Sequence, residues 1–264
     1  LFFMCFIVSG CSSPSDKSQQ MSLTIFKIGK ADSILISYYD QHVLIDTGED
    51  EDAEEILNYF QANDIDQLQA LVITHFDKDH VGGADKIVEK IDIDSIYTAN
   101  YISDSKQTMQ FIESMKKNRL EPIKLMDTTD IIIHDQTITL YPAEKSAYDG
   151  DNDYSIVATI DYQNISMLFA GDAEQARLEE ILHNEHLAKT YDFVKMPHHG
   201  RYNELTPSFV EVISPRYAVI TSSDKNIEDE RTINSLDAVG AEVYTTRNGN
   251  IEVTTDGKTI NVKQ

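Results

Sequence analysis

Short apolar segments alternate with segments of helical spacing along most of this chain. The apolar run 70–74 lies between two helical segments, residues 52–62 and 83–90. The same order returns in the second half, where the apolar run 166–170 precedes a helical segment at 174–186. Strands that alternate with helices form parallel sheets, and the loops at the carboxyl ends of such strands carry functional side chains. The alternation therefore predicts an α/β fold with its functional residues at one edge of a sheet.

The remaining segments add more strands, one more helix and a closing hairpin. The predicted strands are 23–28, 33–38, 43–46, 93–98, 131–133, 137–141, 155–161, 193–196 and 217–221, and the helix is 205–213. The hairpin joins 250–254 to 258–262 through Asp256 and Gly257, a strong signal for a two-residue loop. The economical interpretation is one domain of mixed architecture behind a short leader.

The leader is almost wholly apolar over residues 1–10 and ends in a Val-Ser-Gly-Cys motif at Cys11, after which the sequence turns polar. A segment of this length is too short to span a bilayer, which takes about 20 apolar residues. The pattern resembles the lipobox of bacterial lipoproteins. It predicts a signal peptide at 1–10 without its usual start, a lipid on Cys11, a tether at 11–21 and a domain at 22–264 on the outer face of the cytoplasmic membrane. A buried first strand or helix is the alternative.

Composition excludes several kinds of function. Lys and Arg number 22 against 45 Asp and Glu, which gives a formal net charge of -23. Such a field repels polyanions unless bound cations or a basic patch reverse it locally, so we expect no tight intrinsic binding to nucleic acid. The two cysteines, Cys5 and Cys11, both lie in the leader. A disulfide, a cysteine ligand and a cysteine nucleophile are therefore excluded from the rest of the chain.

Residues 75–80, His-Phe-Asp-Lys-Asp-His, directly follow the apolar run that ends at Thr74. Four ligand-type side chains within six residues, on a loop at the end of a strand, can converge on one point. This pattern predicts that His75 and Asp77 hold one cation while Asp79 and His80 hold a second. A solvated polar loop is the alternative.

Two later strand ends carry ligand-type residues as well. Residues 166–170 lead into a Gly-Asp pair at Asp172, and residues 193–196 lead into the neighbours His198 and His199. A strand that ends in Gly-Asp is by itself more often a turn or a helix cap, and a histidine pair alone is ambiguous. Beside the first loop, Asp172 becomes the expected bridge between two cations, which a shared carboxylate holds about 3.5–4 Å apart.

Taken in order, these motifs resemble the metallo-β-lactamase superfamily, and within it the extracellular hydrolase-like domain of the ComEC competence proteins. The resemblance covers roughly residues 23–225. Asp77 departs from the usual superfamily pattern by replacing a His, and Asn152 stands near the place of a later His ligand; both changes are shared with the ComEC-like branch. The motifs are Ile-Gly-Lys-Ala-Asp-Ser at 28–33, Leu-Ile-Asp-Thr-Gly at 44–48, the loop 75–80, Asn-Asp-Tyr-Ser at 152–155, Phe-Ala-Gly-Asp at 169–172 and Pro-His-His-Gly at 197–200.

The resemblance implies a four-layer αββα sandwich and hydrolysis by a metal-bound hydroxide, with two divalent ions that are Zn²⁺ or Mn²⁺. His199 and Asp79 act in catalysis, and His198 and His199 remain interchangeable as ligand and proton donor. Thr221 ends a strand where related enzymes often carry another His or Asn, which leaves the last ligand open. The implied ligands are His75 and Asp77 on the first ion, Asp79, His80 and His198 on the second and Asp172 between them, with Asp46 and Asn152 contacting the ligands or the substrate.

The implied substrate is a phosphodiester. The first candidate for this phosphodiester is an extracellular nucleic acid, and the second is a phosphorylated cell-wall polymer such as a choline-bearing teichoic acid. A β-lactam or a thioester is a third candidate substrate, of a different chemical class. A metal-binding surface lipoprotein without catalysis is the alternative. The few basic side chains near the motifs, Lys30, Lys78, Lys195 and Arg201, are expected to contact one or two phosphates at most.

Overall fold

The computed structural model describes residues 20–101 and 103–264. Cys11 and the predicted signal peptide lie outside these residues, so the lipid anchor stays a prediction. Strand β1 (Met21–Ile25) begins one residue before the predicted start of the domain. Within the described part of the chain, no helix combines the length and the apolar character needed to cross a membrane.

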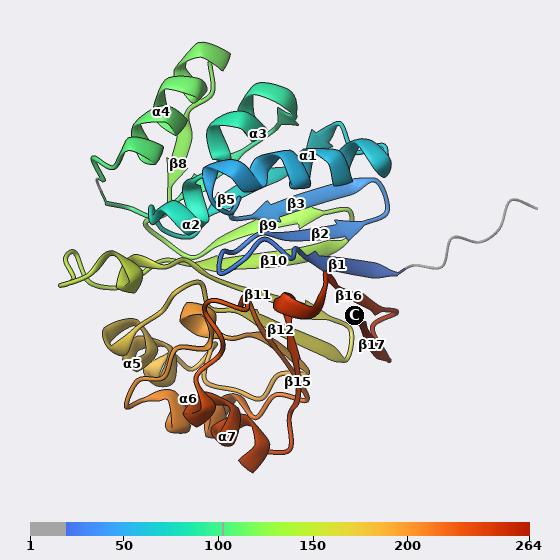
Figure 1. Cartoon of the computed structure of the whole chain (residues 1–264), viewed down its shortest axis with the longest axis vertical. Coiled ribbons are helices and arrows are strands. Elements are labelled where there is room, and N and C mark those ends of the chain that lie inside the picture. Colours follow the sequence, from blue (N-terminus) through green and yellow to red (C-terminus); the bar gives the residue numbers. More distant parts are fainter. Residues whose placement is uncertain (1–19, 102) are drawn as a thin grey trace, which may run out of the picture.

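Two large sheets lie in the middle of the molecule (Figure 1). The first consists of β1, β2 (Ile34–Tyr38), β3 (Gln41–Ile45), β5 (Ala70–Ile73), β7 (Ile96–Thr98), β8 (Pro122–Lys124), β16 (Ile251–Thr255) and β17 (Ile260–Lys263). The second consists of β9 (Thr129–Ile133), β10 (Gln136–Tyr141), β11 (Val157–Tyr162), β12 (Ile165–Phe169), β13 (Phe193–Lys195), β14 (Tyr217–Ile220) and β15 (Glu242–Thr245). A small third sheet pairs β4 (Gln67–Leu68) with β6 (Asp92–Ile93).

Both large sheets are mixed, whereas the sequence predicted parallel pairing. Their strand orders are β17-β16-β1-β2-β3-β5-β7-β8 and β15-β14-β13-β12-β11-β10-β9. The runs β3-β5-β7-β8 and β12-β13-β14-β15 are parallel, and the other neighbours are antiparallel. A two-residue turn, Tyr39 and Asp40, joins β2 to β3, and only antiparallel strands can be joined in this way. The predicted parallel order therefore holds only where helices connect the strands.

Helices cover the outer face of each sheet. Four pack on the first sheet: α1 (Ala53–Ala62), α2 (Lys78–Val81), α3 (Ala84–Lys90) and α4 (Lys106–Asn118). Three pack on the second: α5 (Gln175–His183), α6 (Thr206–Ile213) and α7 (Glu230–Ala238). Short 3₁₀ helices are η1 (Asp50–Asp52), η2 (Asp151–Tyr154), η3 (Pro197–Gly200) and η4 (Thr246–Asn248).

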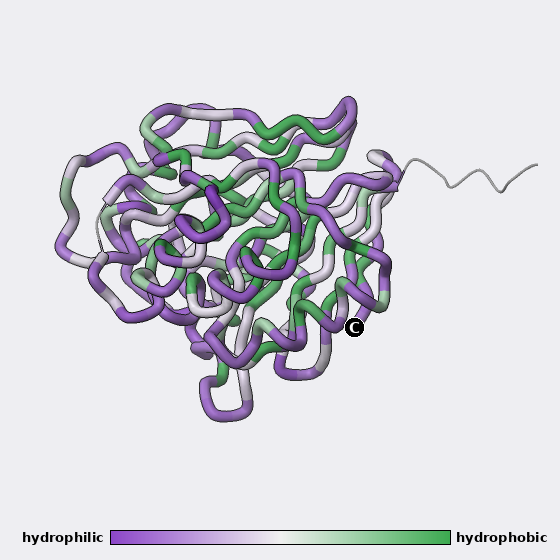
Figure 2. The backbone as a smooth tube through the Cα atoms, turned by 90° about the horizontal axis from the view of Figure 1, so that it is seen from above, coloured by the Kyte–Doolittle hydropathy of each residue, from purple (hydrophilic) through white to green (hydrophobic). Residues whose placement is uncertain are grey.

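Strand β5 shows why the layers form. All four of its residues are buried, and successive side chains point to opposite faces of the sheet. Ala70 and Val72 pack against the other sheet, whereas Leu71 and Ile73 pack against the helices. Figure 2 shows that hydrophobic stretches of the described chain run through the interior, whereas the loops around them are mostly hydrophilic. The predicted four-layer αββα sandwich is thus confirmed.

Several elements were missed or misplaced in the sequence-based prediction. Helix α4 is polar over most of its length and buries little beyond Phe111 and Met115, although Ser105 caps its first turn by accepting from Thr108 N. Helix α7 and strand β15 were missed for the same lack of a long apolar pattern. The predicted strand 93–98 is divided between β6 and β7. Helices α4 and α7 lie on the outer faces of the molecule and β15 at the edge of its sheet, where burial imposes a weaker hydrophobic pattern.

Candidate metal centre

The carboxyl ends of β5, β12 and β13 bring five ligand-type side chains together. His75 follows β5, Asp172 follows β12 and His199 follows β13, and all three are buried. The two Asp172 carboxylate oxygens lie 3.1 Å from His80 Nε2 and 3.1 Å from His199 Nε2. Asp79 Oδ2 lies 3.5 Å from His199 Nε2. We call these five residues the ligand cluster.

The ligand cluster has the donor atoms that a divalent cation requires. Within the described residues, His75 Nε2, His80 Nε2, His199 Nε2 and Asp172 Oδ1 are buried without a hydrogen-bond partner. Buried polar atoms are rarely left unpaired in proteins. One group of potential ligands joins His75, His80 and Asp172, and another joins Asp79, His80 and His199, with the ligand atoms of each group within 4.8 Å of one another. Imidazole nitrogens and carboxylate oxygens in this arrangement fit divalent metal ions.

The motif 75–80 is half loop and half helix, whereas the sequence predicted a loop throughout. Asp77 precedes α2 as its N-cap residue, and Asp79 and His80 lie in the helical turn. This turn packs closely on η1, because a Cβ at Gly82 would lie 2.6 Å from Glu49 Cα. The Asp77 side chain is 43% exposed and its Oδ2 is 3.8 Å from His75 Nε2, so it lies at the rim of the ligand cluster.

Asp46 lies next to the ligand cluster and fixes Thr74 and His80 through hydrogen bonds. Its Oδ1 accepts from Thr74 N at 2.8 Å, and its Oδ2 accepts from Thr74 Oγ1 at 2.7 Å. The same Oδ2 lies 2.7 Å from His80 Nδ1. A carboxylate can only accept at this position, so Nδ1 donates and His80 presents Nε2 to Asp172.

The neighbours His198 and His199 point in different directions. Both have left-handed backbone conformations, with φ of 44° and 53°. His199 Nε2 joins the ligand cluster, whereas His198 Nδ1 lies 2.8 Å from Glu174 Oε1 and its Nε2 is 3.9 Å from Asp172 Oδ2. Asn152 Nδ2 donates to the same Glu174 Oε1 at 3.2 Å. His198 and Asn152 therefore meet at Glu174, a residue that the sequence did not single out.

Charge is concentrated in this centre. Burial opposes the ionised form of Asp172, but His199 and His80 outweigh it and hold the pKa of Asp172 well below its usual range. Burial also opposes protonation of His199, yet Asp172 and Asp32 raise its pKa to about 9. Burial lowers the pKa of His198 to about 4. The carboxylates therefore favour positive charge on His199, whereas burial keeps His198 neutral at pH 7.

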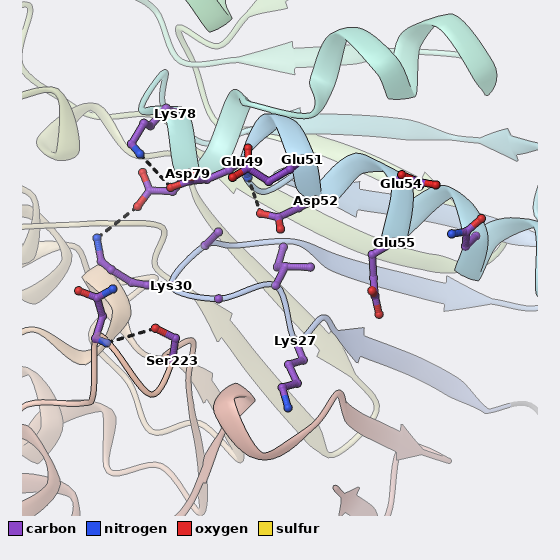
Figure 3. A pocket seen from close by; sticks show the side chains of 15 residues that line it. Lys27, Lys30, Glu49, Glu51, Asp52, Glu54, Glu55, Lys78, Asp79 and Ser223 are labelled. Carbon is purple, nitrogen blue, oxygen red and sulfur yellow. Dashed lines mark hydrogen bonds and ion pairs between the residues drawn. The ribbon is translucent and has the colours of Figure 1, made fainter.

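Two cavities open beside the ligand cluster. The larger, of about 750 Å³, adjoins Asp79 and has the acidic side chains of η1 and α1 along one wall (Figure 3). The smaller, of about 330 Å³, is lined by His198, Arg201 and other residues. Lys30 lines both cavities, and its Nζ lies 3.2 Å from Asp79 Oδ2. A positive side chain thus lies where the two cavities meet the ligand cluster.

Lys195 was predicted as a possible phosphate contact, and the structure contradicts this. It is fully buried at the end of β13, where Nζ is paired with Asp32 Oδ2. Asp32 was part of a recognised motif without an assigned role. Thr221 also lies in this buried group, with its Oγ1 2.8 Å from His199 Nδ1. A lysine in a strand that is buried on both faces was the one available signal that Lys195 is internal.

The model of the metallo-β-lactamase superfamily matches residues 28–222 of the chain. The chain belongs to this superfamily. The match spans all five residues of the ligand cluster, so the predicted resemblance is confirmed. It also includes Asp77, which the resemblance predicts to stand in place of a histidine.

Curated relatives within the superfamily are longer proteins. ComE operon protein 3 of Bacillus subtilis (strain 168) is 24% identical over 246 residues, which are 86% of this chain and 30% of that protein. Competence protein ComA of Neisseria gonorrhoeae is 28% identical over 209 residues, which are 78% of this chain and 28% of that protein. The chain thus spans less than a third of the length of these relatives.

Solved structures show the superfamily fold. The metallo-beta-lactamase fold protein YhfI from Bacillus subtilis aligns with a TM-score of 0.57 and 14% sequence identity, over 86% of this chain and 96% of that one. At this identity the likeness concerns the fold alone. Fold and ligand cluster together make the chain a metal-dependent hydrolase of the superfamily.

Proposed function

We propose that this chain is a phosphodiesterase whose ligand cluster holds two divalent cations. The observation that carries the proposal is the set of buried ligand atoms that face one another without a hydrogen-bond partner, with Lys30 beside them. When bound, such cations lower the pKa of a coordinated water toward about 7 and neutralise charge that develops on the attacked group.

The residues of the chain then take separate roles. His75 serves the first ion with Asp77 at the rim, Asp79 and His80 serve the second, and Asp172 lies between the two. In contrast to the assignment from sequence, we propose that His199 is the ligand of the second ion. His198 lines the smaller cavity and takes the place of His199 as the side chain next to the substrate.

Two basic side chains support a phosphodiester as the substrate. Lys30 and Arg201 line the smaller cavity together with His198. A lysine or guanidinium group there donates to phosphate oxygens. One relative is named as a competence protein, and the predicted resemblance adds an extracellular nucleic acid as first candidate. The net charge of -23 still argues against a long groove that follows a polyanion.

The larger cavity favours a second candidate, a small phosphodiester with a cationic alcohol such as a phosphocholine ester. Its wall carries Glu51, Asp52, Glu54 and Glu55, which form no ion pair with any described residue. Burial raises the pKa of Asp52 to about 6, so this carboxylate lacks compensation by a nearby cation. A positive substrate group would supply that compensation.

Cleavage assays on the full chain distinguish the two candidates. With Mn²⁺ or Zn²⁺ bound, we expect it to hydrolyse a chromogenic phosphodiester and DNA. An inactive Asp172→Asn variant should bind DNA only weakly at physiological salt, because Lys30 and Arg201 reach few phosphates. Turnover of a phosphocholine ester without DNA cleavage would favour the second candidate. The absence of turnover of every phosphodiester with either metal would refute the proposed function.

Metal removal tests the cation requirement. Chelation should abolish hydrolysis, and Mn²⁺ should restore it, because Asp77, Asp79 and Asp172 provide oxygen ligands that suit this harder ion. Metal analysis of protein purified without added metal identifies the ion that it retains. Full restoration by Zn²⁺ together with no response to Mn²⁺ would contradict this expectation.

A further inference from the structure

A buried ion pair lies behind the ligand cluster. Lys195 Nζ is paired with Asp32 Oδ2, donates to Gly171 O at 3.3 Å and lies 3.8 Å from Asp172 Oδ1. Both charged side chains are almost completely inaccessible to solvent. Taking two charges out of water is costly, and a protein is often equally or more stable when apolar residues of similar volume replace a buried ion pair. Stability alone therefore does not account for the pair.

The second oxygen of Asp32 leads to the ligand cluster. Thr221 Oγ1 donates to Asp32 Oδ1 at 2.6 Å and lies 2.8 Å from His199 Nδ1. Asp32 Oδ1 itself is 3.3 Å from the same Nδ1. Because the pairing with Lys195 keeps Asp32 ionised, its carboxylate can only accept hydrogen bonds.

The direction of these hydrogen bonds determines the tautomer of His199. The single hydroxyl proton of Thr221 is committed to Asp32, so Thr221 Oγ1 can only accept from His199. Both polar neighbours of His199 Nδ1 are therefore acceptors, and Nδ1 must carry a proton. In the neutral ring, this leaves the lone pair on Nε2, the atom that lies 3.1 Å from Asp172 and 3.5 Å from Asp79.

We propose that Lys195, Asp32 and Thr221 form a positioning relay that keeps His199 protonated on Nδ1 and aims its Nε2 at the second cation. These three residues touch neither substrate nor the reacting atoms and act through His199. The inference rests on the cation site of the proposed function but is independent of the substrate. It also gives a role to Thr221, which lies at the strand end where the sequence did not identify the last metal ligand.

Substitutions at Thr221 and Asp32 separate the relay from simple packing. Thr221→Val keeps the shape of the side chain but removes the acceptor, and Thr221→Ser restores it. Asp32→Asn keeps an oxygen for Lys195 but turns an amide donor toward Thr221, which reverses the direction of the relay. Lys195→Met would leave the Asp32 carboxylate buried without its cation and endanger folding, whereas in Asp32→Asn the Lys195 ammonium keeps a carboxylate neighbour, Asp172 Oδ1 at 3.8 Å. The test therefore uses the other three variants.

Titration calorimetry with Zn²⁺ alone on the full chain is the first measurement. Loss of an outer hydrogen-bond partner of a ligand histidine weakens metal binding roughly 10–100-fold. We expect losses in this range for Thr221→Val and Asp32→Asn, and an affinity close to wild type for Thr221→Ser. Ser37→Ala is the matched control, because it removes a hydroxyl that lies 2.8 Å from His42 Nδ1, away from the ligand cluster. Its Zn²⁺ affinity should not change.

Nitrogen-15 NMR of the imidazole rings in the Zn²⁺-loaded chain is the second measurement. His199 should show a slowly exchanging Nδ1–H in the wild type and in Thr221→Ser, and this signal should be lost in Thr221→Val. Unchanged Zn²⁺ affinity in both Thr221→Val and Asp32→Asn, or a wild-type His199 protonated on Nε2, would overturn the relay. A wild-type chain that binds Zn²⁺ with the expected tautomer but cleaves no phosphodiester would refute the proposed function and leave the relay standing.

Discussion

Replacing Asp172 with asparagine should lower phosphodiester turnover by at least about a thousandfold, which corresponds to roughly 4 kcal/mol of lost transition-state stabilisation. Each oxygen of Asp172 lies 3.1 Å from a different histidine, Oδ1 from His80 Nε2 and Oδ2 from His199 Nε2. Asparagine preserves the volume but removes the anionic charge shared by both cation positions. Two cations without a shared anion repel each other directly. Steady-state kinetics and metal analysis of the purified variant measure both effects.

Asp77→Asn is the comparison for this prediction. Asp77 is 43% exposed at the rim of the ligand cluster and is closest to His75 alone. Its replacement should reduce turnover by roughly 10–100-fold, with most of the bound metal retained. If Asp172→Asn kept near-normal turnover and metal content, the bridging role of Asp172 would be wrong.

Asp46→Ala should lower the free energy of unfolding of the metal-free chain by about 4 kcal/mol. The substitution removes the acceptor of Thr74 N, Thr74 Oγ1 and His80 Nδ1, all at 2.7–2.8 Å. A buried donor that loses its partner costs about 1–3 kcal/mol. Alanine is also disfavoured at the left-handed φ of 59° found here. For a chain of this size, we expect the melting temperature to fall by roughly 8–16 °C.

A surface pair of the same type provides the control. His134 Nε2 lies 2.7 Å from Asp40 Oδ1, the same distance as in the pair of His80 with Asp46, but the Asp40 side chain is 88% exposed. Exposed ion pairs contribute about 0–1 kcal/mol, so Asp40→Ala should leave the melting temperature almost unchanged. Equal effects of Asp40→Ala and Asp46→Ala in thermal denaturation would show that burial does not determine the role of Asp46.

Much of the fold was predictable because its signals are local. The run Ala70–Ile73 is apolar because the strand is buried on both faces, and His75 follows it after a single residue, Thr74. The same reasoning locates Asp172 after β12 and the histidine pair after β13. The residues that follow the end of a strand can be read directly from the sequence once the strand itself is recognised. The polar helices α4 and α7 were missed because they bury only one narrow face.

The sequence by itself determined the αββα class, the superfamily and the strand ends that carry the ligands. Only the tertiary structure decided that His199 and not His198 enters the ligand cluster, since the backbone conformation at both residues sets where each ring points. Only the tertiary structure placed Lys195 against Asp32, a residue 163 positions away. The physical reason is the same in both cases. Side-chain direction and burial depend on packing between strands that are distant in sequence, and no local spacing of residues records that packing.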